Sequence, residues 1–472
     1  MKTRSIFSAR LLCVVLLSLF PVPAFAAEHL DGTKLGGLWG LPFVGMLLSI
    51  ALMPLFAGHF WEHHQGKIAF LWALIVAVPL FIFQGGGIAV YELAHIVLID
   101  YIPFIVLLLA LFTVAGGIVI RGNIHGSPKT NTALLAIGAV LASCIGTTGA
   151  AMVMIRPVMR ANDNRVHNAH VIIFFIFLVA NIGGSLTPLG DPPLFLGFLH
   201  GVDFFWTTTH LIRETLFVAI LLLAVFFVFD TWYYKKEGVT KSDPTPDRKV
   251  QIVGGANFLL VAAIIGMILM SASIDIGAVT VLGVHIELIN VLRDIGMIAV
   301  VFISLKLTPK ENRVENDFTW GPILEVAKLF AGIFITIVPV LAILKAGTNG
   351  ILAPMVSLVT AADGTPVNAA YFWLTGSLSS FLDNAPTYLV FFQLAGGDPQ
   401  QLMTAGAHTL AAISTGAVYM GANTYIGNAP NFMVYAIARQ GGVKMPSFFG
   451  YMMWSGLILL PVFLLVTLVF FI

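Results

Sequence analysis

Charged residues are scarce in this chain. Lys, Arg, Asp and Glu make up 10% of its 472 residues, whereas 58% are hydrophobic. Soluble domains carry roughly 25% charged residues, so this composition excludes a soluble fold. The charges also balance, with 24 Lys and Arg against 23 Asp and Glu, and without a basic excess the chain has no surface suited to nucleic acid. The composition predicts a polytopic membrane protein whose surroundings are a lipid bilayer.

Cysteine is also rare, with Cys13 and Cys144 as its two occurrences. Cys13 lies in a segment typical of secretory signals. Basic residues precede an apolar run at 11–20 that is too short to span a bilayer, and Ala-Phe-Ala at 24–26 fits the small-x-small cleavage pattern. We therefore predict a cleaved signal peptide at 1–26, a periplasmic mature N-terminus and no intrachain disulfide. An uncleaved first anchor is the alternative.

Long apolar stretches fill the rest of the chain. They are predicted to be helical, because the membrane interior accepts only helices and closed barrels, and no stretch shows the alternating pattern of barrel strands. The stretches long enough to span or re-enter the membrane are 38–56, 68–84, 102–120, 131–156, 169–199, 210–230, 252–271, 291–307, 321–345, 370–393, 405–438 and 447–472.

The distribution of Lys and Arg predicts the orientation of these stretches. If 131–156 and 370–393 each enter and leave the membrane on one side, most basic residues face the cytoplasm, as the positive-inside rule requires. This predicts two re-entrant hairpins of opposite orientation in a bacterial inner membrane protein. The polar segment 231–250 carries five basic residues and is predicted to be a cytoplasmic linker between a first transmembrane repeat, 27–230, and a second, 251–472.

Short motifs recur in the two halves at one fixed offset. An offset of 237 residues without gaps aligns two separate blocks, and one offset that serves both blocks is stronger evidence than either match alone. With the opposite hairpin orientations, it predicts an all-α polytopic membrane protein built from two inverted-topology repeats, each with a re-entrant hairpin and a broken transmembrane helix. Chance similarity is the alternative. The offset pairs Ser143 with Ser380, Thr147 with Asn384, Thr187 with Thr424, Gly190 with Gly427, and Asp191 with Asn428.

Each half contains an apolar stretch that cannot form a continuous helix. The segment 181–193 holds three glycines and three prolines, and 421–431 is similarly rich in glycine, proline and asparagine. A break at membrane depth exposes carbonyls and half-helix ends, which can coordinate a dehydrated cation where they line a protein cavity. A kink needed only for packing is the alternative interpretation.

The hairpin tips, 146–149 and 382–386, supply the other half of a predicted ion site. A charged residue at the membrane centre costs about 2.5–3.5 kcal/mol, so Asp383 is the first candidate and Asp191 the second, although Asp191 before a proline also suits an Asx-turn. If the two carboxylates converge, they can hold a proton or exchange it for a small cation. The predicted sodium site comprises Asp383, Asp191, Asn384 and Asn428, with further neutral oxygens from Asn181, Asn423, Thr147, Thr148, Thr187 and Thr424.

The segment at 181–193, together with Asp-Asn-Ala-Pro at 383–386, resembles the NhaD-type sodium/proton antiporters of the ion transporter superfamily. That superfamily also includes arsenite and citrate transporters. The resemblance implies efflux of sodium or lithium driven by proton entry, no cofactor, and often a homodimer. It carries the family's Asp-Asn motif onto 383–384 and its Thr-Pro-x-Gly-Asp-Pro motif onto 187–192. The first hairpin tip departs from the pattern, because Gly-Thr-Thr-Gly has no carboxylate, and this leaves the ion stoichiometry open.

Three functional classes are compatible with these features. The first is a sodium/proton antiporter, and the second is a transporter of citrate or another carboxylate. The third is an intramembrane aspartyl protease with Asp191 and Asp383 as a dyad, which the proline-flanked, symmetry-related positions disfavour, so no enzyme activity is expected. Other acidic residues, including Glu92 and Asp100, fall near predicted helix ends outside the cytoplasm and are expected to be interfacial.

Overall fold

The computed structural model describes residues 29–238 and 248–472. The predicted signal peptide lies outside these ranges. Ten helices of the described chain are long and apolar enough to cross a membrane, and the only strands described form two short antiparallel ribbons. The prediction of an all-α polytopic membrane protein is therefore confirmed.

The first half runs from an N-terminal segment to a long helix that ends before the central connection. Its elements are η1 (Gly32–Lys34), η2 (Gly37–Gly40), α2 (Leu41–Phe56), α3 (Gly58–Pro79), η3 (Leu80–Gln84), α4 (Gly86–His95), η4 (Ile96–Tyr101), α5 (Ile102–Ala115), β1 (Val119–Arg121), α6 (Pro128–Ile145), α7 (Thr147–Ala161), α8 (Ala169–Leu178), η5 (Ile182–Leu186), α9 (Pro192–Leu199) and α10 (Trp206–Glu237).

The second half begins with a strand that pairs with β1 and ends with the C-terminal helix. Its elements are β2 (Gln251–Val253), α11 (Ala256–Ser273), β3 (Ala278–Val281), β4 (Val284–Glu287), α12 (Leu288–Leu307), α13 (Lys310–Glu315), α14 (Gly321–Lys345), η6 (Gly347–Asn349), α15 (Ala353–Leu358), α16 (Asn368–Phe381), α17 (Asn384–Leu394), α18 (Pro399–Met403), α19 (Ala407–Met420), η7 (Gly421–Asn423), α20 (Ala429–Gln440), α21 (Phe448–Val466) and η8 (Thr467–Phe471).

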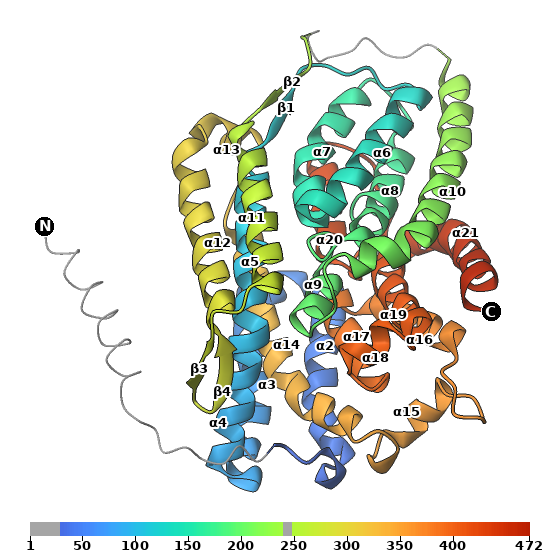
Figure 1. The fold of residues 1–472 in the computed structure, drawn as a ribbon. Coiled ribbons are helices and arrows are strands. Elements are labelled where there is room, and N and C mark those ends of the chain that lie inside the picture. The colour runs from blue at the N-terminus through green and yellow to red at the C-terminus, as the bar shows by residue number, and fades with distance from the viewer. Residues whose placement is uncertain (1–28, 239–247) are drawn as a thin grey trace, which may run out of the picture.

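Each segment predicted as a hairpin or a broken helix holds two successive helices. α6 and α7 meet at Gly146, and they lie in the upper part of the molecule, whereas α16 and α17 lie in the lower part (Figure 1). α8 and α9 are separated by the first predicted break, and α19 and α20 by the second. α7 and α17 begin 237 residues apart, as do α9 and α20, so the offset found in the sequence also relates helix starts.

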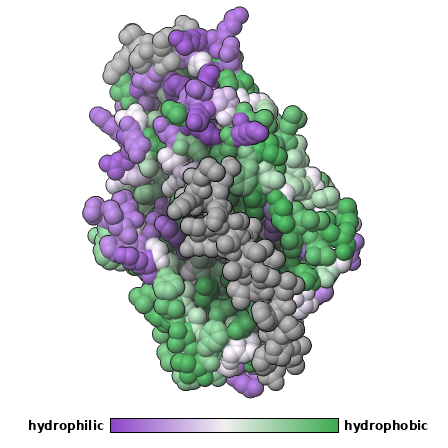
Figure 2. Space-filling view, turned by 90° about the vertical axis from the view of Figure 1, so that its left-hand side faces the viewer, coloured by the Kyte–Doolittle hydropathy of each residue, from purple (hydrophilic) through white to green (hydrophobic). Residues whose placement is uncertain are grey.

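The remaining helices pack beside this core. α5, α11 and α12 pack side by side, and α3 packs against α14 (Figure 1). The span that begins with α8 is 89% buried, but the spans of α11 and α12 are 28% and 33% buried, so the broken helix lies at the centre. In Figure 2 hydrophilic residues gather toward the upper end and hydrophobic residues dominate the lower half of the visible face.

One expectation about the first half is wrong. The predicted span 102–120 is in fact a continuous helix of 30 residues from Gly86 to Ala115, formed by α4, η4 and α5. Asp100 therefore lies near the middle of a span, where its side chain is 1% exposed. It is not interfacial. Glu92, His95 and Asp100 itself interrupt the apolar pattern of 86–102, and so the sequence did not show that the helix continues there.

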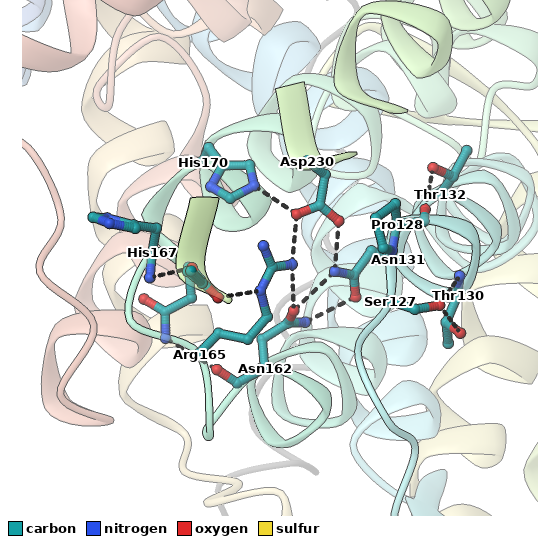
Figure 3. A network of polar contacts seen from close by, with 12 residues as sticks. Ser127, Pro128, Thr130, Asn131, Thr132, Asn162, Arg165, His167, His170 and Asp230 are labelled. Carbon is teal, nitrogen blue, oxygen red and sulfur yellow. Dashed lines mark hydrogen bonds and ion pairs between the residues drawn. The ribbon is translucent and has the colours of Figure 1, made fainter. Parts of the chain in front are cut away.

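A buried ionic network joins the ends of α6, α7, α8 and α10 (Figure 3). Arg165 Nη1 donates to Asp230 Oδ1 at 2.5 Å, and its Nε donates to Glu237 at 3.3 Å. His170 Nε2 lies 2.8 Å from Asp230 Oδ1, and Asn131 Nδ2 donates to Asp230 Oδ2 at 2.9 Å. Because these side chains come from three helices and a loop, the network fixes the base of the first hairpin to the helices that flank it.

Candidate functional site

Asp191 is the centre of a polar cluster at the point where the two halves meet. Its side chain is 1% exposed. Thr147 Oγ1 donates to Asp191 Oδ1 at 2.9 Å, and Asn428 Nδ2 donates to the same oxygen at 3.1 Å. Asn384 Nδ2 donates to Asp191 Oδ2. The carboxylate is thus held by three neutral donors, one from its own half and two from the other.

The four residues of this cluster mark the starts of four half-helices. Thr147 is the first residue of α7 and Asn384 the first of α17, while Asp191 and Asn428 directly precede α9 and α20. Helix N-termini carry partial positive charge and unpaired N–H groups. Four of them at one point offset the cost of burying one carboxylate and leave the site attractive to anions as well.

Glycine permits the sharp turns that bring these starts together. Gly146 has a φ of 79° between α6 and α7, a conformation that other residues rarely adopt. Gly190 packs so closely on Gly184 that a Cβ at Gly190 would lie 2.1 Å from the carbonyl oxygen of Gly184. In the second half, a Cβ at Gly427 would lie 2.6 Å from the carbonyl oxygen of Gly421. Both breaks therefore depend on close backbone contact.

Matching hydrogen bonds hold each hairpin to its own broken helix. Thr187 Oγ1 donates to the carbonyl of Ser143 at 2.5 Å, and Thr424 Oγ1 donates to the carbonyl of Ser380 at the same distance. The donors are 237 residues apart, and so are the acceptors. Thr187 and Thr424 therefore hold the two helix breaks in place, and each uses its hydroxyl proton for this hydrogen bond.

A chain of asparagine amides links the two breaks. Asn181 Oδ1 accepts from Asn428 Nδ2 at 3.2 Å, and Asn181 Nδ2 donates to Asn431 Oδ1 at 2.7 Å. Asn431 in turn donates to the carbonyls of Gly421 and Thr424 at 2.8 and 2.9 Å. Asn431 was missing from the candidates that the sequence provided, although its place one helical turn after Asn428 could have indicated a shared face.

A cavity of about 80 Å³ adjoins the cluster. Its wall is mostly apolar and comes from α5, α9, α14, α20 and the first hairpin tip. Thr147, Thr148 and Asp191 are its polar lining side chains, and no Lys or Arg is among the lining residues. Any substrate that enters this space meets a carboxylate and hydroxyls but no basic side chain.

Two predicted site residues lie beside the cluster rather than in it. Asp383 caps its own helix, because its Oδ1 accepts from the backbone N–H of Ala385 at 3.1 Å, and its side chain is partly exposed. Asn423 donates to Ser380 Oγ at 2.9 Å, close to the tip of the second hairpin. The structure thus brings together Asp191, Asn384, Asn428, Thr147 and Asn181, and it does not hydrogen-bond Asp383 to Asp191.

One atom of the cluster is unsatisfied. Asn384 Oδ1 is buried and accepts no hydrogen bond from the described residues, although its amide nitrogen bonds Asp191. An unpaired buried acceptor costs about 1–3 kcal/mol, so it indicates a missing partner. Carboxylate and amide oxygens are ligands that hard cations such as sodium prefer.

Comparison with known proteins agrees with a transport role. No curated protein matches the chain. A family model described as putative citrate transport matches residues 32–471, which include both hairpins, both breaks and the helices around them. This family consists of membrane transporters within the ion transporter superfamily. Because the match extends over nearly the whole chain, the protein belongs to the putative citrate transport family.

Proposed function

We propose that this protein is a secondary active transporter that exchanges sodium or lithium for protons, and that both ions bind at Asp191. The observation that carries the proposal is a buried carboxylate surrounded by neutral groups, one of which, the amide of Asn384, has an unsatisfied Oδ1. A site with one fixed negative charge and no basic side chain in its cavity favours a monovalent cation.

Exchange follows from competition for one carboxylate. A proton on Asp191 neutralises the buried charge, and so does a sodium ion, but the two cannot bind the same oxygen together. The donor of Asn384 and its unsatisfied Oδ1 belong to one amide, so half a turn of that amide replaces a hydrogen bond to Asp191 with a second oxygen ligand. Thr147 and Asn428 keep the carboxylate in place in both states.

Alternating access is supported by the position of the cluster. Asp191 belongs to the first half, and it is bonded by Asn384 and Asn428 of the second. Helix starts, glycine contacts and hydroxyl hydrogen bonds recur in the two halves at the same offset. We interpret this as evidence for two inverted repeats, with the ion site on the axis that relates them. Movement of one repeat against the other would break and remake those bonds and expose Asp191 to either side in turn.

Sodium-dependent proton movement in everted membrane vesicles tests this proposal. Addition of sodium to vesicles acidified inside should dequench a pH-sensitive dye, and Asp191→Asn should abolish the signal because it removes the charge at nearly constant volume. Asp203→Asn is the matched control, since Asp203 lies on an exposed loop and its side chain accepts from the nearby N–H of Phe205, a bond that asparagine can also accept. No response to sodium or lithium in wild-type vesicles that contain the protein would contradict the proposal.

Transport of citrate or another carboxylate is the second candidate. It is favoured by the family description and by the four helix N-termini, which can bind carboxylate oxygens. In this case sodium at Asp191 would supply the positive charge that the cavity lacks. Uptake of labelled citrate into right-side-out vesicles, with and without a sodium gradient, tests this candidate. Sodium-dependent uptake without sodium-driven proton movement would replace the first proposal with the second.

A further inference from the structure

Asp100 is a buried carboxylate that the Asp191 cluster does not use. It lies on η4, in the middle of the span from Gly86 to Ala115, with 1% of its side chain exposed. Its Oδ1 accepts no hydrogen bond within the described chain and lies 3.5 Å from Nδ1 of His200. An ionisable residue at membrane depth is expensive and is a functional candidate by default.

The π-helical form of η4 places Asp100 above a second titratable residue. A π-helix bonds each residue to the fifth one along the chain, so residues five apart stack on one face, which an α-helix would not allow. His95, at the end of α4, precedes Asp100 by five residues, and the charges of the two side chains act on each other. The irregular turn therefore aligns His95 with Asp100.

Further titratable groups connect His95 to the surface. Glu92 lies three residues before His95 on α4, a spacing that places the two side chains next to each other on one face of the helix. His29 Nδ1 is 3.8 Å from Glu92 Oε1, and the His29 side chain is 67% exposed. The positive-inside distribution places this end of the span outside the cytoplasm. A series of proton-binding groups thus leads from the outer surface to Asp100.

His200 connects this series to the ion site. It terminates α9, the half-helix that begins directly after Asp191. The eight residues of α9 separate the two by roughly 12 Å at 1.5 Å per residue. The imidazole also meets Phe392 of α17 edge-on, with ring centroids 5.9 Å apart. His200 therefore contacts the outer helix layer, the first broken helix and the second hairpin together.

We propose that Asp100 and His200 form the outer proton-accepting pair of the transport cycle, and that protons pass between the outer surface and Asp191 through them. The proposal depends on the proton exchange proposed above. A proton that reaches the Asp100 carboxylate can move to the imidazole of His200 and leave a carboxylate and an imidazolium. The neutral ring accepts this proton at Nδ1 when its own proton is on Nε2. The new Nδ1–H then faces two acceptors, the Asp100 carboxylate and the carbonyl of Leu196 at 3.0 Å, and the Nε2 proton is the one that leaves the ring.

Other charged groups near the pair do not replace it. The charges that act on Asp100 are those of His200 and His95. α5 has no charged residue, and α14 directs Glu325 toward Gln65 of α3 rather than toward η4. From α17, Tyr388 is the titratable residue that packs against α9, at Gly197.

Two transport readouts on reconstituted protein test the pair. Sodium-driven proton movement requires a proton path, whereas exchange of labelled sodium for sodium at equal concentrations requires Asp191 and alternating access but no net proton transfer. We expect Asp100→Asn and His200→Gln to lower sodium-driven proton movement at least about a hundredfold, the lower edge of what a positioned proton carrier contributes, and to leave sodium exchange unchanged. Asp100→Glu should restore proton movement with a shifted pH profile.

His210→Gln is the matched control. His210 makes the same Nδ1 contact to the carbonyl four residues earlier, at 3.0 Å, but is exposed on α10. An unchanged rate and pH profile in both Asp100→Asn and His200→Gln would overturn the proposal. Equal loss of both readouts in variants that elute like wild type would also overturn it, because it would indicate a structural role. Failure of the exchange function itself would appear in the wild type as an absence of sodium-driven proton movement.

Discussion

Removal of the Asp230 charge should strongly destabilise the protein. In Asp230→Asn the side chain keeps its shape, but Arg165 loses a carboxylate partner at 2.5 Å, and neither side chain of the pair is exposed to solvent. Loss of one partner of a buried ion pair costs about 3–5 kcal/mol. Glu237 still lies 3.3 Å from Arg165 and partly compensates its charge. We therefore expect the free energy of unfolding to fall by about 3 kcal/mol, the lower end of this range, which changes the unfolding equilibrium constant roughly a hundredfold.

Denaturant unfolding in detergent micelles measures this free energy. The control is Asp317→Asn, since Asp317 pairs with Arg156 at 2.7 Å but its side chain is 78% exposed. Exposed pairs contribute about 0–1 kcal/mol, and asparagine tolerates the positive φ of 45° at this position. The two variants should therefore differ by about 2 kcal/mol or more.

A second substitution tests the reason for the effect. Arg165→Met in the Asp230→Asn background removes the unpaired charge and should recover much of the lost stability, because apolar replacements of buried pairs are often neutral. If Asp230→Asn costs no more than Asp317→Asn, or if the added Arg165→Met only destabilises further, the reasoning from burial is refuted.

Three further predictions concern transport. Gly190→Ala should abolish transport, because the new Cβ would lie 2.1 Å from the carbonyl oxygen of Gly184. Gly266→Ala is the control and should transport normally, because no atom lies within 4 Å of its Cβ position. Flux assays on the two purified variants test this difference. Asp383→Asn should retain the sodium-driven proton movement that Asp191→Asn loses, because asparagine caps helices as well as aspartate does. Equal loss of proton movement in everted vesicles of the two variants would show that Asp383 also binds the transported ion. The apparent KM for sodium should rise as pH falls, up to about tenfold per pH unit, because protons and sodium compete for Asp191; a KM independent of pH would contradict a shared carboxylate.

The sequence was informative where polar residues interrupt apolar stretches. Such interruptions are costly in a bilayer, and so Thr147, Asp191, Asn384 and Asn428 could be identified as site candidates from the local sequence alone. The fixed offset then indicated which of them occupy equivalent positions in the two halves. The structure places all four in one hydrogen-bonded cluster.

Contacts between distant helices could not be predicted in this way. Asp383 and Asp191 have similar local sequence patterns, and only the fold shows that Asp383 caps its own helix while Asp191 is bonded from the opposite half. Asp100 resembled an interfacial residue because its partner His200 is 100 positions away. The π-helical turn that aligns it with His95 has no signal in hydropathy.

The network around Arg165 has no counterpart in the described residues of the other half. The offset of 237 places Leu402 opposite Arg165, Ala407 opposite His170 and Thr467 opposite Asp230. At Thr467 neutral hydrogen bonds take the place of the ionic contacts: Trp373 Nε1 donates to its Oγ1 at 2.9 Å, and its hydroxyl donates to the carbonyl of Phe463 at 2.8 Å. The two halves therefore have a similar order of helices but differ in stiffness. Distortion of the first hairpin at its base would separate buried charges, whereas movement of the second hairpin would break only neutral contacts. During a transport cycle the second hairpin would therefore deform more than the first. The free-energy barrier for opening the ion site to one side of the membrane would then differ from the barrier for opening it to the other side.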